Sequence, residues 1–285
     1  MFRRATFADA SSDLMDAEFV IMGMPFDSTT SFRPGSRAGP EAVRQASWNF
    51  ETYVHRHGVN LNDLKVCDLG DLDMGSTPKG AWEAIRAGIG LLPAGALPVT
   101  IGGEHSITPP IVGELLRRGK ASVLVLDAHL DLREEYGGTE KSHACASRRI
   151  LDLPIEGYAS IGIRSGSEEE YKYARDMGIE FHESDEVAER GMNAVLDDAL
   201  DGLSERIYLS IDFDAIDPAF APAVGNPEPF GLHPRDVRLV IDRLADRIAG
   251  LDINEIAPVY DSGQTATLGA KLIREFMAAR ASGRE

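Results

Sequence analysis

Three apolar segments of this chain each lead into residues that commonly bind metal ions. The segments read VTIGGEHS, VLVLDAHLDLR and YLSIDFDAIDP, and the metal-binding types in them are His105, Asp127, His129, Asp131, Asp212 and Asp214. Burying an unpaired carboxylate is costly, and two carboxylates beside an imidazole are costlier still. A divalent cation among these side chains removes that cost, because both group types are metal ligands. The segments therefore predict a metal site in which carboxylates are the majority.

The number of these ligands favours two ions over one. Asp127, His129 and Asp131 alternate along the chain and share one face if the backbone stays extended, as do Asp212 and Asp214. Shared carboxylates can hold a pair of ions about 3.5–4 Å apart. Hard oxygen ligands with imidazole favour manganese without excluding other divalent ions. We therefore expect two manganese ions per chain.

Each motif has a less specific interpretation when it is taken alone. An Asp-x-His-x-Asp run is often a polar loop, and aspartates near strand ends are common in turns. His105, after two glycines, could equally be a core histidine. His55 and His57 are spaced like a metal pair, but their segment is polar and we interpret them as surface histidines. Three motifs that each follow an apolar segment still favour one shared site, since buried charges are usually paired or metal-bound.

The elements that position these residues follow an alternating pattern. Apolar, strand-like runs lie near residues 19–26, 97–103, 121–129, 158–163, 206–214 and 250–258. Helix-like stretches such as GPEAVRQASWNFETYV and PRDVRLVIDRLADRIAG separate them. This alternation indicates a parallel sheet covered on both faces, and no linker divides the chain. We expect one α/β domain over residues 1–285, with a doubly wound, mostly parallel sheet that binds ligands beyond the carboxyl ends of its strands.

Composition restricts the partners and the compartment. The formal net charge is −17, from 46 acidic and 29 basic residues, which argues against nucleic acid and anionic membranes. It suits a cationic substrate, although a solvated acidic surface explains it more simply. Cys67 and Cys145 form no CxxC pair, so we expect no disulfide framework and a reducing cytoplasm. No run reaches the length of a membrane span, and the N-terminus lacks the apolar core of a signal peptide.

Longer blocks around these motifs resemble the ureohydrolases, the family of arginases and agmatinases. The blocks are GGEHSIT, DAHLDLR, SIDFDAIDPAFAPAVGNPEPFGL, GMPFDSTTSFRPGSRAGPEAVRQAS and LDINEIAPVYDSGQTATLGAKLI. They occur in family order over nearly the whole chain. The resemblance implies a three-layer α/β/α sandwich, and a binuclear manganese centre that hydrolyses a guanidinium group to urea and an amine. It also implies a homo-oligomer, either a trimer or a hexamer.

The resemblance assigns the metal ligands individually. Asp127 and Asp212 would bridge the two manganese ions. The other ligands would divide between the ions, with His105 and Asp131 on one, and His129 and Asp214 on the other. A bound water whose pKa falls toward neutrality, about 7 in well-studied zinc sites, would supply the attacking hydroxide.

Further roles also follow from the resemblance. Glu255 would bind the guanidinium group, and His143 would pass a proton to the departing amine. Asn226 stands in a substrate-binding block where threonine is common. Glu104 replaces the usual aspartate before the first metal histidine, and the loop SHACAS after residue 141 differs from the common His-Gly.

The far end of the substrate decides specificity among ureohydrolases. Ser167 and Arg133 stand where arginases use an aspartate and an asparagine to hold the amino acid end, so arginine is a poor candidate. Glu134 and Glu135 could bind the amine of agmatine, or be two solvated loop residues. We expect agmatine to be hydrolysed to urea and putrescine. Aminopropylated agmatine is the nearest alternative, ahead of guanidinobutyrate.

Two other classes of protein are less consistent with the sequence. A two-metal phosphoesterase also carries Asp-x-His, but here GDLD at 70–73 precedes that motif and no Gly-Asn-His follows it. A non-catalytic, metal-binding relative would not need Glu255 and His143 beside all six ligands.

Overall fold

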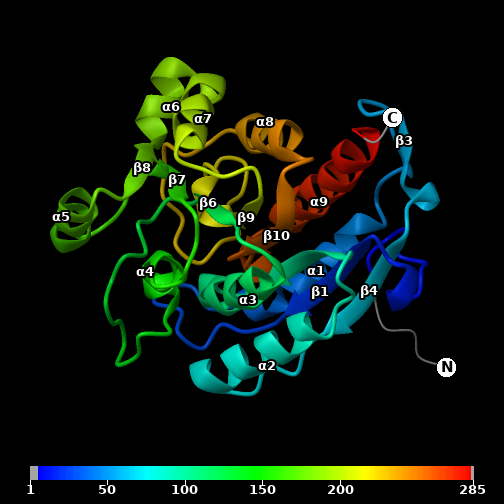
Figure 1. Ribbon diagram of the computed structural model, residues 1–285, viewed down its shortest axis with the longest axis horizontal. Helices are drawn as coiled ribbons and strands as arrows, with labels where there is room; N and C mark the ends of the chain where they lie inside the picture. Colours follow the sequence, from blue (N-terminus) through cyan, green and yellow to red (C-terminus); the bar gives the residue numbers. More distant parts are fainter. Residues whose placement is uncertain (1–5, 284–285) are drawn as a thin grey trace.

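Eight parallel strands form the central sheet of the computed structural model, which describes residues 6–283 (Figure 1). The strands lie in the order β4-β1-β5-β10-β9-β6-β7-β8, and every neighbouring pair is parallel. Their bounds are β1 Phe19–Met24, β4 Val66–Asp71, β5 Leu97–Gly102, β6 Ser122–Leu126, β7 Tyr158–Ile163, β8 Glu180–Glu183, β9 Ile207–Asp212 and β10 Ile248–Asn254. A separate antiparallel hairpin joins β2 (Tyr53–Val54) to β3 (Val59–Asn60).

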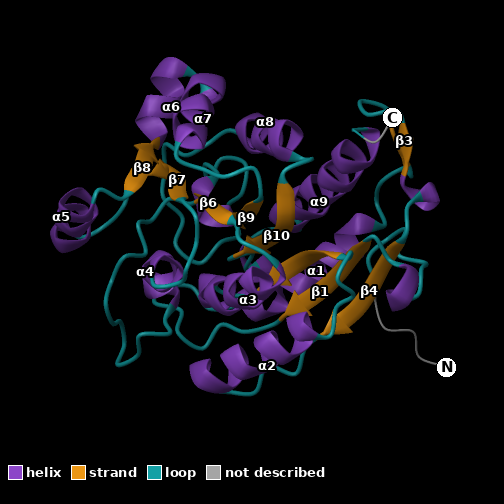
Figure 2. Cartoon of the chain, in the orientation of Figure 1, coloured by secondary structure: helices purple, strands orange, loops and turns teal. Residues whose placement is uncertain are grey.

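Helices cover both faces of this sheet (Figure 2). One layer contains α1, α6, α7, α8 and α9, and the opposite layer contains α2, α3 and α4, each with its own apolar core against the sheet. The bounds are α1 Gly39–Ser47, α2 Pro78–Gly90, α3 Thr108–Leu115, α4 Ala146–Leu151, α5 Glu168–Met177, α6 Ser184–Arg190, α7 Met192–Asp201, α8 Pro234–Leu244 and α9 Gln264–Ser282. The predicted three-layer α/β/α sandwich is confirmed.

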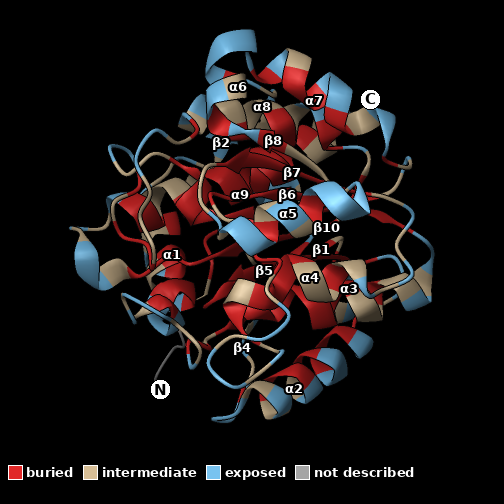
Figure 3. Cartoon of the chain, turned by 90° about the vertical axis from the view of Figure 1, so that its left-hand side faces the viewer, coloured by how far each residue is buried: buried red, intermediate tan, exposed pale blue. Residues whose placement is uncertain are grey.

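The strands are apolar throughout because successive side chains enter different layers. In β6, Leu124 and Leu126 belong to the core beneath α8 and α9, whereas Val123 and Val125 belong to the core beneath α3. Figure 3 shows the result, with buried strands between helices whose outer surfaces are exposed. A strand buried on both faces has no polar face, which explains the continuous apolar runs. No helix among the described residues is both long and apolar enough to cross a membrane.

The sheet order places the chemical motifs next to one another. β5, β10, β9 and β6 are consecutive neighbours at the centre of the sheet, although β6 and β9 are far apart in sequence. Their carboxyl ends therefore meet at one edge. Beyond this edge lies α5, which begins with a capping box: Ser167 Oγ accepts from Glu170 N–H (3.3 Å), and Glu170 Oε2 accepts from Ser167 N–H (2.9 Å).

Candidate metal centre

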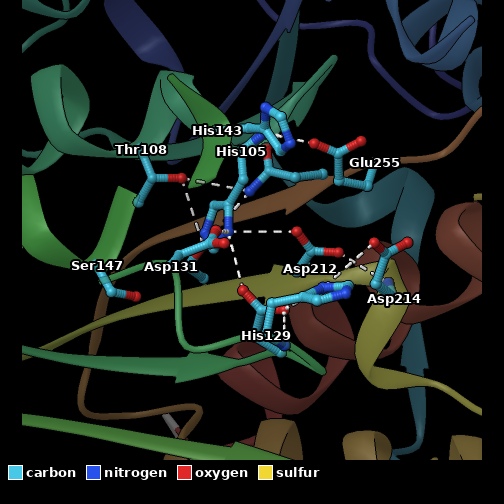
Figure 4. A network of polar contacts seen from close by, with 12 residues as sticks. His105, Thr108, His129, Asp131, His143, Ser147, Asp212, Asp214 and Glu255 are labelled. Atoms are coloured by element: carbon cyan, nitrogen blue, oxygen red, sulfur yellow. Dashed lines mark hydrogen bonds and ion pairs between the residues drawn. The ribbon is translucent and has the colours of Figure 1, made fainter. Parts of the chain in front are cut away.

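The six predicted ligands converge at the carboxyl ends of β5, β6 and β9 (Figure 4). His105 Nδ1 lies 3.1 Å from Asp127 Oδ2, and 3.2 Å from both Asp131 Oδ2 and Asp212 Oδ2. His129 Nδ1 lies 3.6 Å from Asp127 Oδ1 and 3.6 Å from an oxygen of Asp214. Asp127 thus presents one oxygen to each histidine, which is the arrangement of a carboxylate that bridges two ions.

These atoms have the donor chemistry of an ion site. Within residues 6–283, His105 Nδ1, Asp127 Oδ2 and Asp214 Oδ1 are buried without a hydrogen-bond partner. The contacts of His105 Nδ1 with the carboxylates are therefore close approaches that lack hydrogen-bond geometry. Buried polar atoms without partners are unfavourable, and divalent cations bound among these side chains would satisfy them. The donor set fits one or more divalent ions.

Tight turns, and not extended strands, bring the ligands together. The strand-like run expected near residues 121–129 is shorter than that, because β6 ends at Leu126 and only an isolated parallel bridge joins His129 to Ser165. Asp127 Oδ1 accepts the N–H of His129 (2.8 Å), and Asp212 Oδ1 accepts the N–H of Asp214 (2.8 Å). Each aspartate thereby closes a turn over the next ligand, which gives the two-residue spacing of both motifs a physical reason.

Asp131 and Glu255 have strained backbones, with φ of 50° and 63°. Non-glycine residues rarely occupy this left-handed region, and those that do cluster at functional sites. In Glu255 the turn at the end of β10 directs the side chain toward His105, whose N–H donates to Glu255 Oε1 (2.8 Å).

The carboxylates repel one another in the absence of a cation. Burial, reinforced by the charges of Asp212 and Glu104, raises the pKa of Glu255 well above its usual value. Burial, with the charge of Asp127, raises the pKa of Asp131 to about 7. Burial by itself lowers the pKa of His129, but the surrounding carboxylates have the larger effect and raise this pKa to about 9. Protons thus supply the positive charge that metal ions would otherwise provide.

A buried polar network orients His105 from behind. Ser210 Oγ lies 3.0 Å from His105 Nε2 and donates to Asp252 Oδ1 (2.6 Å). Asn254 Nδ2 also donates to Asp252 Oδ1 (2.7 Å), and Tyr208 OH donates to Asp252 Oδ2 (2.6 Å). Such a network turns the other ring nitrogen, Nδ1, toward the ligand cluster. None of these residues was predicted from the sequence, although Asp252 and Asn254 within an apolar run are a signal that could have found them.

His143 lies in the wall of the same cavity, near Thr29. Thr29 Oγ1 donates to Glu104 Oε1 (2.6 Å) and lies 3.1 Å from His143 Nδ1. Ser142 Oγ lies 3.3 Å from the same nitrogen. Because the Thr29 proton is directed at Glu104, Thr29 Oγ1 can accept from a neutral ring that carries its proton on Nδ1, and this tautomer leaves Nε2 as the basic nitrogen. Burial, with the positive charges of His129 and His105, lowers the pKa of His143 to about 4.

A cavity of about 330 Å³ opens over the ligand cluster. Besides ligands, its lining includes Glu255, His143 and Asn226, and the last of these donates its N–H to Asp214 Oδ2 (3.3 Å). The structure therefore brings together all six predicted ligands and these three residues. Asn226 Oδ1 also accepts from Ser31 Oγ at the rim (3.4 Å).

Glu134 and Glu135 lie outside this cavity, which corrects the expectation that they form its amine end. They line an adjoining surface hollow beside Arg148 and Tyr173, which shares Arg133, Ser167 and Glu170 with the cavity. The side chain of Glu134 is 67% exposed and pairs with Arg148 (2.6 Å) and Arg149 (3.2 Å), so its charge is already balanced. Arg133 and Tyr136 on either side of this pair do line the cavity, so it is these two glutamate side chains that lie outside it.

Other acidic residues line the cavity instead. Glu170 Oε1 accepts the N–H of Leu132 (3.0 Å), and Glu170 Oε2 lies 3.5 Å from Arg133 Nε. Glu228, which is only half-buried, accepts from Ser165 Oγ (3.1 Å) and lies 3.8 Å from His129 Nε2. Glu228 follows Asn226 in the block GNPEPFGL, and that proximity was the available sequence signal.

Known proteins are similar to this chain in sequence and in fold. Agmatinase of Pyrococcus horikoshii is 38% identical over 92% of this chain and 91% of its own length. The N(1)-aminopropylagmatine ureohydrolase of Thermococcus kodakarensis is 36% identical over 90% and 88%. The crystal structure of agmatine ureohydrolase of Thermoplasma volcanium superposes with a TM-score of 0.94 at 39% identity, covering 100% of this chain and 97% of that one.

The family model of the arginases matches residues 17–279, which include all six predicted ligands, His143 and Glu255. With this match and the relatives above, the chain belongs to the arginase family.

Proposed function

We propose that this protein hydrolyses the guanidinium group of agmatine to urea and putrescine. The observation that carries the proposal is the convergence of Glu255 and six metal-type ligands on one cavity of about 330 Å³. Relatives named agmatinase in organisms as different as Pyrococcus horikoshii and Bacillus subtilis, at 38% and 34% identity, support the choice of substrate.

The six ligands would hold two manganese ions, and Asp127 and Asp212 would be ligands of both. When bound, the ions would neutralise the carboxylates and supply a water molecule of lowered pKa. The contacts of His105 Nδ1 with Asp127, Asp131 and Asp212 support one subsite. The contacts of His129 Nδ1 with Asp127 and Asp214 support the other. Hard oxygens with imidazole support manganese as the ion.

Glu255 would bind the guanidinium group. Its Oε1 is held by the N–H of His105, and a Cβ placed on Gly225 would lie 2.8 Å from its Oε2. Glycine at position 225 therefore leaves the second oxygen accessible beside the cavity. A planar guanidinium suits a carboxylate whose two oxygens can each accept an N–H. The cation would also keep Glu255 ionised, against the burial that raises its pKa.

His143 would pass the proton that the departing amine needs. Its lowered pKa keeps the ring neutral near pH 7, so Nε2 can take a proton from water and then donate it. Thr29 and Glu104 hold the ring from the Nδ1 side, as the short contacts between them indicate.

Glu228 is the carboxylate that we propose for the amine end of the substrate, in place of Glu134 and Glu135. It is half-buried at the cavity beyond His129, where its charge attracts a primary ammonium group. The same feature suits aminopropylagmatine, a longer cation, and the relative from Thermococcus kodakarensis makes this the second candidate substrate. Arginine and guanidinobutyrate carry a carboxylate that Glu228 would repel.

The test compares kcat/KM for agmatine, aminopropylagmatine, guanidinobutyrate and arginine on manganese-loaded enzyme, with urea as the product measured. We expect agmatine to be the preferred substrate. A tenfold preference for arginine or guanidinobutyrate, equivalent to about 1.4 kcal/mol of transition-state binding, would overturn the proposed specificity. If none of the four compounds released urea, the hydrolytic function would be wrong.

Substituting Glu228 tests the amine end directly. Glu228→Gln removes the charge and keeps the shape, so we expect kcat/KM for agmatine to fall about fivefold to tenfold, as for a partly exposed ion pair of about 1 kcal/mol. Glu134→Gln is the matched control, because that glutamate is exposed and paired with Arg148. Equal losses in the two variants would remove Glu228 from the amine site.

A further inference from the structure

A second group of metal-type ligands lies away from the cavity. It consists of His57 in the turn between β2 and β3, Asp242 near the end of α8, and Glu275 in the second half of α9. Both helices begin near the carboxyl ends of the strands and run back along the sheet. These residues therefore lie toward the amino ends of the strands. Figure 1 shows β3 beside the C-terminal end of α9.

Three unpartnered atoms meet in this group. His57 Nε2 lies 3.3 Å from Asp242 Oδ1 and 3.2 Å from Glu275 Oε2. All three atoms are buried, and within the described part of the chain none of them has a hydrogen-bond partner. The Glu275 side chain is only 4% exposed, so its free oxygen is directed at His57 from the protein interior. The same combination of close approach without hydrogen-bond geometry occurs at His105.

The remaining oxygens of the two carboxylates are already paired. Asp242 Oδ2 forms an ion pair with Arg56, and Glu275 Oε1 lies 3.0 Å from Lys271 Nζ. Each carboxylate is thus anchored by one oxygen and presents the other to His57. This anchoring fixes the position of both free oxygens before any ligand arrives, which lowers the conformational cost of binding.

The geometry favours a shared ion over a simple ion pair. A protonated ring that paired with one carboxylate would direct its N–H at that oxygen, and neither contact has this geometry. Ligand atoms around a tetrahedral ion with bonds of about 2.0 Å lie about 3.3 Å apart, which is close to the two contacts of Nε2. One imidazole and two carboxylates are a ligand set that zinc and its neighbours accept.

We propose that His57 Nε2, Asp242 Oδ1 and Glu275 Oε2 bind a divalent transition-metal ion of the zinc type. The ion fastens the β2–β3 hairpin to α8 and α9, three elements joined there by side chains more than 30 residues apart in sequence. The site is independent of the proposed hydrolysis, because none of its ligands lines the cavity over the other cluster.

The test counts ions in the complete enzyme. Protein loaded with Mn²⁺ is equilibrated with Zn²⁺, freed of unbound ions by gel filtration, and its total divalent metal per chain is measured by elemental analysis. His57→Gln is expected to hold about one ion fewer than the wild type. Asp242→Asn keeps an oxygen for Arg56 and is expected to lose the same ion. This second variant tests the proposal if His57→Gln folds poorly.

His55→Gln is the matched control, because His55 is exposed in the same hairpin and belongs to no ligand group among residues 6–283. It should bind as many ions as the wild type. Zn²⁺ at 100 times its Kd should shift the unfolding equilibrium about 100-fold more in the wild type and His55→Gln than in His57→Gln.

Equal ion counts in the wild type, His57→Gln and Asp242→Asn would overturn the proposal and leave His57 in an ion pair. Loss of an ion in His55→Gln as well would overturn the assignment to His57. The test uses the difference between variants, so it does not depend on how many ions the other cluster holds. The second metal site could therefore be confirmed even if the protein released no urea.

Discussion

Asp127 contacts both histidines of the candidate metal centre. Its Oδ2 faces His105 and its Oδ1 faces His129, whose N–H it also accepts at 2.8 Å. The side chain is completely buried and lies between the two histidines. Removing its charge should therefore affect both proposed ions, and also the turn that places His129.

This position leads to a comparison of two substitutions. Asp127→Asn should lower manganese content and abolish urea release, because one charge is lost from both ion sites. His143→Asn should retain manganese and lose about 10²–10⁴ in kcat, the usual contribution of a positioned acid or base. Elemental analysis and steady-state kinetics on the same samples check both expectations. Wild-type kcat in His143→Asn across the pH range would show that His143 has no catalytic role.

At the scale of elements, the centre depends on how β5, β9 and β10 are aligned. Asp252 and Asn254 on β10 pair in register with Ser210 and Asp212 on β9. This register places the Asp252 carboxylate beside Ser210 and so behind His105, which follows β5. The strands therefore supply the ligands and also the groups that hold one of them in orientation.

Ser210→Ala tests this supporting network. We expect manganese affinity to fall about 10–100-fold, as is typical when a group that orients a metal ligand is removed. With saturating Mn²⁺, kcat should stay close to that of the wild type, because Ser210 does not line the cavity. Metal titrations monitored by activity measure both quantities. Ser160→Ala, at a buried serine of β7, is the control, and an equal loss of affinity there would contradict the expectation.

At the scale of the whole molecule, a strongly acidic chain also buries a group of carboxylates in its interior. The net charge is −17, and the cluster alone buries Asp127, Asp131, Asp212 and Asp214 beside Glu255. Without cations, burial and mutual repulsion keep protons on part of this cluster, as the raised pKa values of Glu255 and Asp131 indicate. Assembly into a trimer or hexamer, and a cytoplasmic location, stay predictions.

Metal removal should accordingly affect both activity and stability. Chelation is expected to abolish urea release and lower Tm, because ions that bind only the folded state stabilise it by mass action. Manganese should restore both, with about two ions per chain at the cavity when activity is complete. His57→Gln is the suitable background for this count, since it lacks the second proposed site. Full activity with one ion or fewer would rule out the binuclear mechanism.

The sequence by itself determined the parallel sheet and the layers around it, and it predicted the residues that meet in the candidate metal centre. A continuous apolar run indicates a segment that is buried on both faces. His105, Asp127 and Asp212 come at or just after the ends of such runs. These are local properties, because they depend on neighbours within a few residues. The expected roles of the ligands, of His143 and of Glu255 came from the family resemblance.

Only the tertiary structure decided which side chains meet. Periodicity does not say that β9 lies between β6 and β10, so the network from Asp252 to His105 could not be read from it. The direction of a side chain after a strand depends on the turn, which is why Glu228 lines the cavity and Glu134 does not. The meeting of His57 with Glu275, 218 residues later, likewise requires the helices to pack first.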